Sequence, residues 1–364
     1  MMPAAFILLL QPSAIGEQSA LRTSGPVANE IGALWNLMLG LGLVATVLTF
    51  MALAYALFRT RRTNELPPEA DRPADASGEL HNDESGGRGR EDVGRPRSER
   101  RGVHAMIVAG VIVPVVVLSV VLVVTLRVLA KITPTPTSSN TIVIDIAGRQ
   151  YWWAVRYLDA AEPSRVFETA NELHVPVGIP VQLRLRTVDV IHSFWVPGLA
   201  GKMDLVPGRT NVMTLQADRA GIWRGQCAEF CGVQHGKMAI VVVAEPKEQF
   251  ERWRVAQQAS ATGVTLSDSA QATAQLADRE VFLRSGCVLC HAVRGTPAGG
   301  RAGPDLTHVA TRLTLAAGTL PNNMGNLYGW IADPQSHKPG SAMPAVPMTA
   351  LELHAIARYL GSLK

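Results

Sequence analysis

Cys227-Ala-Glu-Phe-Cys231-Gly-Val-Gln-His235-Gly-Lys-Met238 is the most informative stretch of this 364-residue chain. It places two thiols, an imidazole and a thioether on one short loop, and such soft ligands suit copper. Two thiolates on one loop can approach a common point and bridge two metal ions. A disulfide and a zinc site are the alternatives. The disulfide would leave His235 and Met238 without a role, and zinc gains nothing from a methionine.

A second imidazole comes from the upstream stretch Asp189-Val-Ile-His192-Ser-Phe-Trp-Val-Pro197. Together the two stretches resemble the dinuclear CuA site of the cytochrome c oxidase subunit II family. The resemblance implies a cupredoxin-type domain, and a magnesium ion that the Glu229 side chain touches at the interface with subunit I. The copper ligands that it implies are bridging Cys227 and Cys231, terminal His192 and His235, and, as weak axial ligands, Met238 and the Glu229 carbonyl.

An aromatic run, Gly148-Arg-Gln-Tyr151-Trp152-Trp153, resembles the family segment that lies over the copper pair. Family members usually carry tryptophan at the position of Tyr151, where electrons enter from cytochrome c. The resemblance therefore makes Tyr151, Trp152 and Trp153 candidates for electron entry. Plain core packing is the alternative, since adjacent aromatic residues often fill a core.

Cys287-Val-Leu-Cys290-His291 is a C-x-x-C-H motif, the attachment signature of c-type haem. Cys287 and Cys290 would form the thioether bonds, and His291 would ligate the iron. All four cysteines of the chain lie in these two motifs, which favours cofactor binding over structural crosslinks. The sixth iron ligand is sought among three methionines. The stretch from Trp330 to Pro344 resembles the distal loop of small class I cytochromes c and selects Met343, whereas core packing explains Met324 and Met348.

Two apolar runs, at about residues 31–57 and 103–126, are long enough to cross a membrane as helices. The loop 58–101 between them is rich in glycine, proline and charge, so we expect it to be disordered, and arginines at both of its edges place it in the cytoplasm. The N-terminus and the chain after Arg127 then face the periplasm. Nucleic-acid binding is excluded, because the basic residues flank apolar spans and no aromatic platform accompanies them.

The remaining patterns divide the chain into several parts and predict a multidomain membrane protein. Residues 1–30 contain an apolar run that fits a signal peptide, although a positively charged start is absent. Short β-branched segments indicate an all-β domain over 138–245. The predicted divisions are the N-terminal segment 1–30, a two-helix transmembrane hairpin 31–130, a cupredoxin-like CuA domain 138–245, a linker 246–273 and an all-α class I cytochrome c domain 274–364.

The resemblance covers nearly the whole chain after residue 18 and implies subunit II of a bacterial aa3-family oxidase of the caa3 type, with a fused cytochrome c. Its expected role in the inner membrane is an electron relay. Electrons would pass from haem c through CuA to haem a of subunit I, where oxygen is reduced to water with proton pumping. This chain itself has no oxygen-reducing site, so it would act as one subunit of a cytochrome-c oxidase. Expected partners are subunit I, subunit III and an upstream cytochrome c or quinol–cytochrome c reductase.

Two other functions remain open. The electron-input subunit of a CuA-containing nitric oxide reductase would carry the same centres, and a membrane-anchored copper carrier would use some of the same ligands. One departure limits the resemblance. Many family members place a glutamate near the start of the second transmembrane helix, at a proton pathway, but the nearest acid here is Glu99 at the membrane edge. The sequence therefore does not predict proton uptake through this subunit.

Overall fold

The computed structural model describes residues 16–63, 102, 104–133, 141–159, 161–260 and 269–364. The predicted signal peptide, most of the loop 58–101 with Glu99, and part of the predicted linker lie outside these residues. The described chain forms two compact units, which are treated separately below. One contains residues 33–131, and the other contains the remaining described residues.

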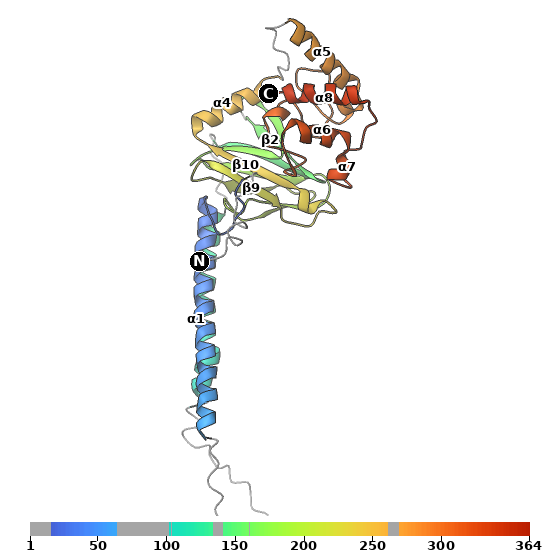
Figure 1. Ribbon diagram of the computed structural model, residues 1–364. Coiled ribbons are helices and arrows are strands. Elements are labelled where there is room, and N and C mark those ends of the chain that lie inside the picture. Colours follow the sequence, from blue (N-terminus) through green and yellow to red (C-terminus); the bar gives the residue numbers. More distant parts are fainter. Residues whose placement is uncertain (1–15, 64–101, 103, 134–140, 160, 261–268) are drawn as a thin grey trace, which may run out of the picture. The chain divides into compact units, whose positions relative to one another are not determined.

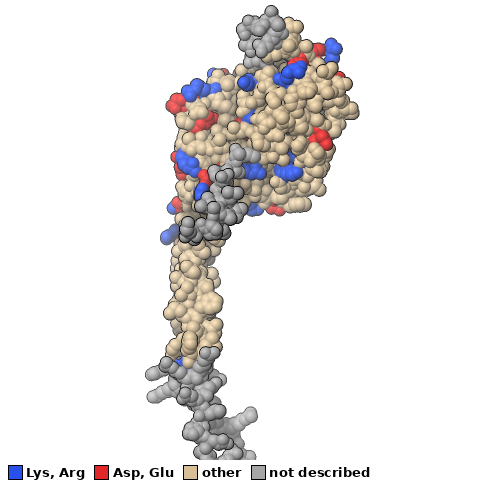
Figure 2. Space-filling view, viewed as in Figure 1, with Lys and Arg blue, Asp and Glu red and all other residues tan. Residues whose placement is uncertain are grey.

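Two helices are long and apolar enough to cross a membrane. The first span, Pro26–Arg59, has a mean hydropathy of 2.3, and the second, His104–Ile132, reaches 3.2. Figure 2 shows few charged side chains along most of the visible length of the first helix. Their elements are α1 (Pro26–Thr63), the π-helical turn η3 (Val108–Ile112) and α3 (Val113–Ile132).

Both spans extend beyond the predicted runs. Helix α1 begins with Pro26, a residue that favours the first position of a helix because its missing N–H would be unpaired there. The helix also continues through Thr63, so the first residues of the predicted loop are helical. The apolar pattern therefore predicted only the apolar middle part of this helix.

The segment from Ile142 to Glu245 forms two five-stranded sheets (Figure 1). One has the order β3-β2-β1-β5-β8 and the other β4-β10-β9-β6-β7. The pairs β1–β5 and β4–β10 are parallel, and all other pairs are antiparallel. The strands are β1 (Ile142–Arg149), β2 (Trp152–Leu158), β3 (Phe167–Ala170), β4 (Glu172–Pro176), β5 (Val181–Thr187), β6 (His192–Trp195), β7 (Met203–Leu205), β8 (Asn211–Leu215), β9 (Gly221–Cys227) and β10 (Ala239–Glu245), with the short helices η4 (Pro163–Arg165) and η5 (His235–Lys237) between them.

The two sheets share one hydrophobic core, to which both contribute alternate apolar residues. Trp153 of β2, Leu183 of β5, Phe194 of β6 and Ile240 of β10 are all fully buried in it. Burial of a large apolar side chain stabilises a fold by about 1.5–3 kcal/mol, so this core holds the sandwich together. The core also fixes the ends of β6, β9 and β10, where the predicted metal ligands lie.

The predicted linker begins with an ordered helix, α4 (Lys247–Gln258). Phe250 on this helix is fully buried in the core of the sandwich, and Trp253 packs beside it. The first half of the predicted linker is therefore part of the β-domain.

The C-terminal part is helical and has its own core. Helix α8 packs against both α5 and α6 (Figure 1). Arg358 of α8 forms a bidentate ion pair with Asp278 of α5, at 2.7 and 2.8 Å. A capping box joins Thr349 and Glu352 at the start of α8. The elements are α5 (Ser269–Arg284), η6 (Gly286–Leu289), η7 (Val309–Thr311), β11 (Thr314–Leu315), β12 (Leu320–Pro321), α6 (Met324–Ala332), α7 (Pro334–His337) and α8 (Ala350–Ser362).

Candidate metal centre and haem pocket

The two thiols of the opening motif lie at the centre of a cluster of soft donors. Cys227 ends β9 and Cys231 lies on the following loop, and their sulfurs are 3.8 Å apart. Both cysteines are free and buried. A disulfide has a sulfur–sulfur distance of about 2.05 Å, so the disulfide alternative does not describe this structure.

Each thiol has its own imidazole neighbour. Nδ1 of His192 lies 3.8 Å from Sγ of Cys227, and Nδ1 of His235 lies 3.8 Å from Sγ of Cys231. The donor atoms of His192, Cys227 and Cys231 all fall within 4.8 Å of one another. The imidazoles therefore flank the sulfur pair, one beside each thiol.

Two weaker donors complete the set. Sδ of the fully buried Met238 lies 3.9 Å from Sγ of Cys231. The carbonyl oxygen of Glu229 lies 3.1 Å from Sγ of Cys227. A single tetrahedral zinc ion needs four donors. Six donors around two sulfurs would instead suit two ions, which the two thiolates, the two imidazoles and the two weak donors would hold.

The protonation of the sulfur pair favours metal binding. The pKa of Cys227 is lowered to about 3, chiefly by its hydrogen bond with the Cys231 thiol and, against the effect of burial, by bonds from His192 and the backbone. The same contact and burial raise the pKa of Cys231. A thiolate is the form that binds metal, so the pair presents one thiolate before any ion enters.

Asp189 orients one of the imidazoles, a role that the sequence analysis did not assign. Its Oδ1 lies 2.8 Å from Nε2 of His192, which leaves Nδ1 of the ring facing Cys227. Burial would lower the pKa of His192, but its bonds to Cys227 and Asp189 raise the pKa above the usual value. A carboxylate that holds the outer nitrogen of a ligand histidine is common around metal ions. The Asp189-x-x-His192 spacing is the signal that could have identified it.

The His192 ring packs against Gly148, where the absence of a side chain leaves space for it. A Cβ atom on Gly148 would come within 2.7 Å of Cδ2 of His192, so a side chain there would displace the imidazole. Trp153 packs edge-on against the same ring, with 6.0 Å between the ring centroids.

The Glu229 side chain pairs with a lysine. It is partly exposed, and its Oε2 lies 3.6 Å from Nζ of Lys202. Magnesium prefers six oxygen ligands in octahedral geometry. One carboxylate paired with a lysine does not make such a site by itself.

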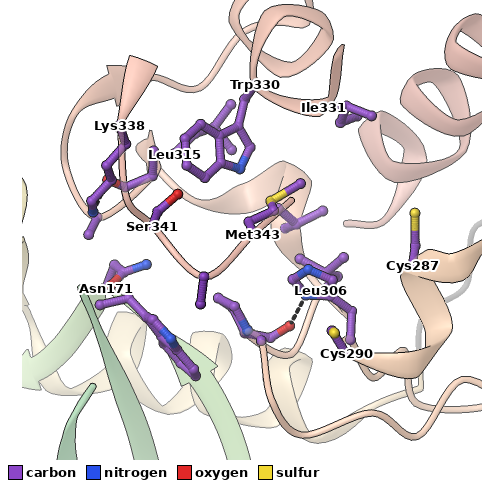
Figure 3. Close-up of a pocket in the computed structure, with 18 of the residues that line it drawn as sticks. Asn171, Cys287, Cys290, Leu306, Leu315, Trp330, Ile331, Lys338, Ser341 and Met343 are labelled. Atoms are coloured by element: carbon purple, nitrogen blue, oxygen red, sulfur yellow. Dashed lines mark hydrogen bonds between the residues drawn. The ribbon is translucent and has the colours of Figure 1, made fainter. Parts of the chain in front are cut away.

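The C-x-x-C-H motif lines an apolar cavity that is partly open to solvent (Figure 3). Cys287, Cys290 and His291 lie along it, together with Met343. Both cysteines are free. The mostly apolar lining, with a candidate axial ligand in His291 and another in Met343, suits a planar macrocycle better than a single ion.

Close contacts with the neighbouring backbone set the orientation of the His291 ring. Nδ1 of the ring lies 2.7 Å from the carbonyl oxygen of Pro304, which leaves Nε2 free for the cavity. A Cβ atom on Gly303 would come within 2.6 Å of the ring, and one on Gly300 within 2.5 Å of the Cys290 backbone. Burial lowers the pKa of His291, so the imidazole is neutral and able to ligate iron.

Of the three candidate methionines, only Met343 lines the cavity. Figure 3 shows its thioether between Trp330 and Leu306. Nε2 of Gln335 donates to the Met343 carbonyl at 2.7 Å and thereby holds the loop, a contact that the sequence analysis missed. Met324 instead packs against Gly361 of helix α8, and Met348 packs on the core of the helical domain.

The aromatic run reaches both sites. Tyr151 and Trp152 line the haem cavity, whereas Trp153 is fully buried beneath His192. The hydroxyl of Tyr151 lies next to Gly232, in the loop between the predicted copper ligands Cys231 and His235, where a Cβ atom would come within 2.5 Å of it. The three candidates for electron entry therefore span the distance between the two sites.

Two family models match the chain. Residues 145–245 match the cytochrome c oxidase subunit II periplasmic domain, and residues 279–364 match cytochrome c. The chain therefore carries these two domains in this order. The first type of domain implies a dinuclear copper centre and the second implies haem c, and the donor set and the cavity described above fit both groups.

Curated relatives carry the name cytochrome c oxidase subunit 2. The protein from Alkalihalophilus pseudofirmus is 40% identical over 64% of this chain and 64% of its own length. That from Bacillus sp. strain PS3 is 34% identical over 62% of this chain and 63% of its own length. The matched part is thus just under two thirds of each relative.

Among solved structures, the periplasmic domain of subunit II of cytochrome oxidase from Bradyrhizobium japonicum is similar to 34% of this chain. The match covers 97% of that domain at 28% identity, with a TM-score of 0.32. The predicted fold class is confirmed by the family matches and by the elements described above: two apolar helices, a cupredoxin-like β-domain and a helical cytochrome c domain. The two apolar helices and the periplasmic type of domain indicate a membrane protein with external domains.

Proposed function

We propose that this chain is the electron-relay subunit II of a haem-copper terminal oxidase. Electrons would pass from haem c through CuA to haem a of subunit I, where oxygen is reduced to water and protons are pumped. The observation that carries the proposal is that the six-donor cluster and the haem cavity lie in one compact unit, joined by residues 151–153. Fusion of the two domains converts a diffusive encounter into an intramolecular one.

The ligands that we propose follow from the donor set. When bound, the copper pair and the haem would each supply a reversible one-electron redox couple. The proposed copper ligands are Cys227 and Cys231 as bridges, His192 and His235 as terminal ligands, and Met238 and the Glu229 carbonyl as weak ligands. The proposed haem ligands are Cys287 and Cys290 as covalent attachments and His291 and Met343 as axial ligands.

The surrounding residues prepare the two sites. Asp189 accepts a hydrogen bond from Nε2 of His192 and so keeps Nδ1 available to a metal. The Pro304 carbonyl accepts a hydrogen bond from Nδ1 of His291 and so keeps Nε2 available. Tyr151, Trp152 and Trp153 are the proposed path between the centres, because they contact the haem cavity at one end and His192 at the other.

We also propose partner subunits, an electron donor and a magnesium ligand. Subunit I would accept the electrons in the bacterial inner membrane, beside subunit III. An upstream cytochrome c or quinol–cytochrome c reductase would supply them. The Glu229 carboxylate could ligate magnesium only if it left Lys202 and if subunit I supplied further oxygen ligands. The alternative role in a nitric oxide reductase is not favoured, because the curated relatives are named for cytochrome c oxidase.

Rapid reduction of the full-length protein tests the relay. The chain is produced with covalent haem and loaded with copper, and the haem is reduced in a stopped-flow mixer. We expect haem reduction to be followed by the transfer of electrons to copper, seen as loss of the mixed-valence copper signal. Addition of subunit I with its haem a should then extend the transfer. A protein that binds haem but gives no dinuclear copper signal would refute the proposal.

A further inference from the structure

Lys338 is a buried lysine at the contact between the β-domain and the cytochrome domain. Its side chain is 2% exposed, and it is one of the largest fully buried side chains in the described chain. Nζ donates to the carbonyl oxygen of Tyr151 at 2.7 Å and to that of Ala316 at 3.1 Å. The first acceptor belongs to the β-domain and the second to the cytochrome domain. Figure 3 shows Lys338 at the edge of the cavity, near Ser341 of the loop that leads to Met343.

The environment of this lysine contains backbone acceptors and no counter-charge. Among the described residues, no carboxylate lies within ion-pair distance of Nζ, and a buried ammonium without one is costly. Burial accordingly lowers the pKa of Lys338 to about 7. The nearby charged or titratable groups are Cys231, which raises the pKa, and Lys237, which lowers it. A neutral amine has two N–H groups, which match the two carbonyl acceptors.

The acceptor Ala316 begins a turn that itself touches the β-domain. Ala316, Ala317 and Gly318 all have positive φ angles, of 52°, 58° and 72°. The two alanines are strained in this region, where glycine is favoured. The turn places the Ala317 carbonyl 3.0 Å from the amide nitrogen of Ala239, at the start of β10. The strained turn and Lys338 therefore hold the same contact from two sides.

The acceptor Tyr151 leads on to the copper loop. Its hydroxyl lies next to Gly232, and the side chain of the preceding residue, Gln150, donates from Nε2 to the Cys231 carbonyl at 2.6 Å. A short series of contacts thus runs from the Met343 loop through Lys338 and Tyr151 to Cys231.

We propose that Lys338 is a positioning residue, which fastens the Met343 loop to the backbone of Tyr151 and so holds the haem cavity at one place relative to the copper ligands. The expected effect on the rate of electron transfer rests on the proposed function. The docking itself is a property of the fold and can be measured separately.

The experiment compares the full-length protein with Lys338→Leu, which removes both donated bonds. Lys247→Leu is the matched control, because it removes an exposed lysine at the start of α4. Hydrogen–deuterium exchange measures docking at the amides of Ala239 and Leu313, which donate across the same contact to Ala317 and to Glu172. The amides of β5 report whether the β-domain remains folded. Stopped-flow reduction measures the rate of electron exchange between haem and copper.

We expect Lys338→Leu to keep both cofactor spectra and the protection of β5, to lose at least tenfold protection at Ala239 and Leu313, and to exchange electrons at least tenfold more slowly. Lys247→Leu should match the wild type. Unchanged protection and rate in Lys338→Leu would overturn the inference. Missing cofactor spectra in the wild type would instead refute the proposed function, and the amide exchange would still decide the role of Lys338.

A pH series in the wild type decides the outcome if Lys338→Leu also loses the protection of β5. A lysine whose pKa is lowered in the docked state binds fewer protons there than in the undocked state, so docking strengthens as pH rises above about 7. Protection at Ala239, corrected for the intrinsic exchange rate, should therefore increase from pH 7 to pH 9. Constant or falling protection would overturn the inference.

Discussion

Trp152 and Trp153 are adjacent in β2 but face the two different sites: Trp152 lines the haem cavity, and Trp153 is fully buried with its ring 6.0 Å from that of His192. This follows from strand geometry, because successive side chains of a β-strand point to opposite faces. One peptide unit therefore joins a residue at the haem cavity to a residue that contacts a proposed copper ligand. The two tryptophans should respond differently to substitution.

Replacement of Trp153 by alanine should mainly affect stability. Truncation of a fully buried tryptophan typically costs about 3–5 kcal/mol, and the lost ring would also free His192 to move. Replacement of Trp152, which is only half-buried, should cost less stability and should slow electron exchange between haem and copper. Denaturant unfolding of the β-domain and stopped-flow reduction separate the two effects. Equal losses of stability in both variants would contradict this assignment.

Asp189→Asn should weaken copper binding without affecting the haem. The carboxylate accepts a hydrogen bond from Nε2 of His192, and the loss of such a partner typically lowers metal affinity by roughly 10–100-fold. Competition with a copper chelator measures the affinity, and the haem absorbance serves as an internal reference. Asp218→Asn is the matched control, since this exposed aspartate lies in the same domain and bonds to Asn29. Equal copper affinity in the Asp189 variant and the control would remove Asp189 from the site.

Met343→Ala should lower the reduction potential of the haem, because a methionine ligand raises it. The same substitution at Met324 should leave the potential unchanged, since that side chain packs against Gly361 away from the cavity. Potentiometric titration of the haem absorbance measures both variants, and the low-spin spectrum should be lost only in the Met343 variant. A potential that falls in Met324→Ala and not in Met343→Ala would reverse the choice of ligand.

The local parts of both sites could be predicted from the sequence because their ligands are close together along the chain. Cys227, Cys231 and His235 share one loop, and Cys287, Cys290 and His291 share one turn. The short β-branched segments also indicated an all-β domain over 138–245, where strands β1 to β10 lie. In each of these cases, residues that are close along the chain form the site or the strand by themselves.

The contacts between the domains could not be predicted in the same way. Lys338 and Tyr151 are 187 residues apart, and nothing in a lone lysine indicates that it is buried beneath a carbonyl of another domain. Gln335 and Asp189 were missed for a related reason, since each acts by holding another residue in place. The bounds of the membrane helices also differed, because hydropathy marks the lipid-facing stretch and caps such as Pro26 mark the ends of the helix.

The buried side chain of His174 lies between two carboxylates and should make the stability of the β-domain depend on pH. Nδ1 lies 2.6 Å from Glu245 and Nε2 lies 3.0 Å from Glu172. Burial would lower the pKa of His174, but the hydrogen bonds and charges of the two glutamates outweigh it and raise the pKa above 6.5. The ring also stacks on Trp253, with 4.0 Å between centroids.

The sign of the pH effect follows from this raised pKa. The folded state binds the proton more tightly than the unfolded state, so the stabilisation is fully present below about pH 6.5 and is lost as pH rises through the folded pKa of His174. Hydrogen bonds to charged groups typically contribute about 1.5–3 kcal/mol, and two such bonds are involved here. The fluorescence of Trp253 can follow unfolding of the β-domain, and the variant Trp253→Phe identifies its share of the signal. Unfolding should require less denaturant as pH rises above neutrality. In His174→Gln this dependence should disappear, and a wild type that grows more stable over the same range would show that His174 is neutral between its carboxylates.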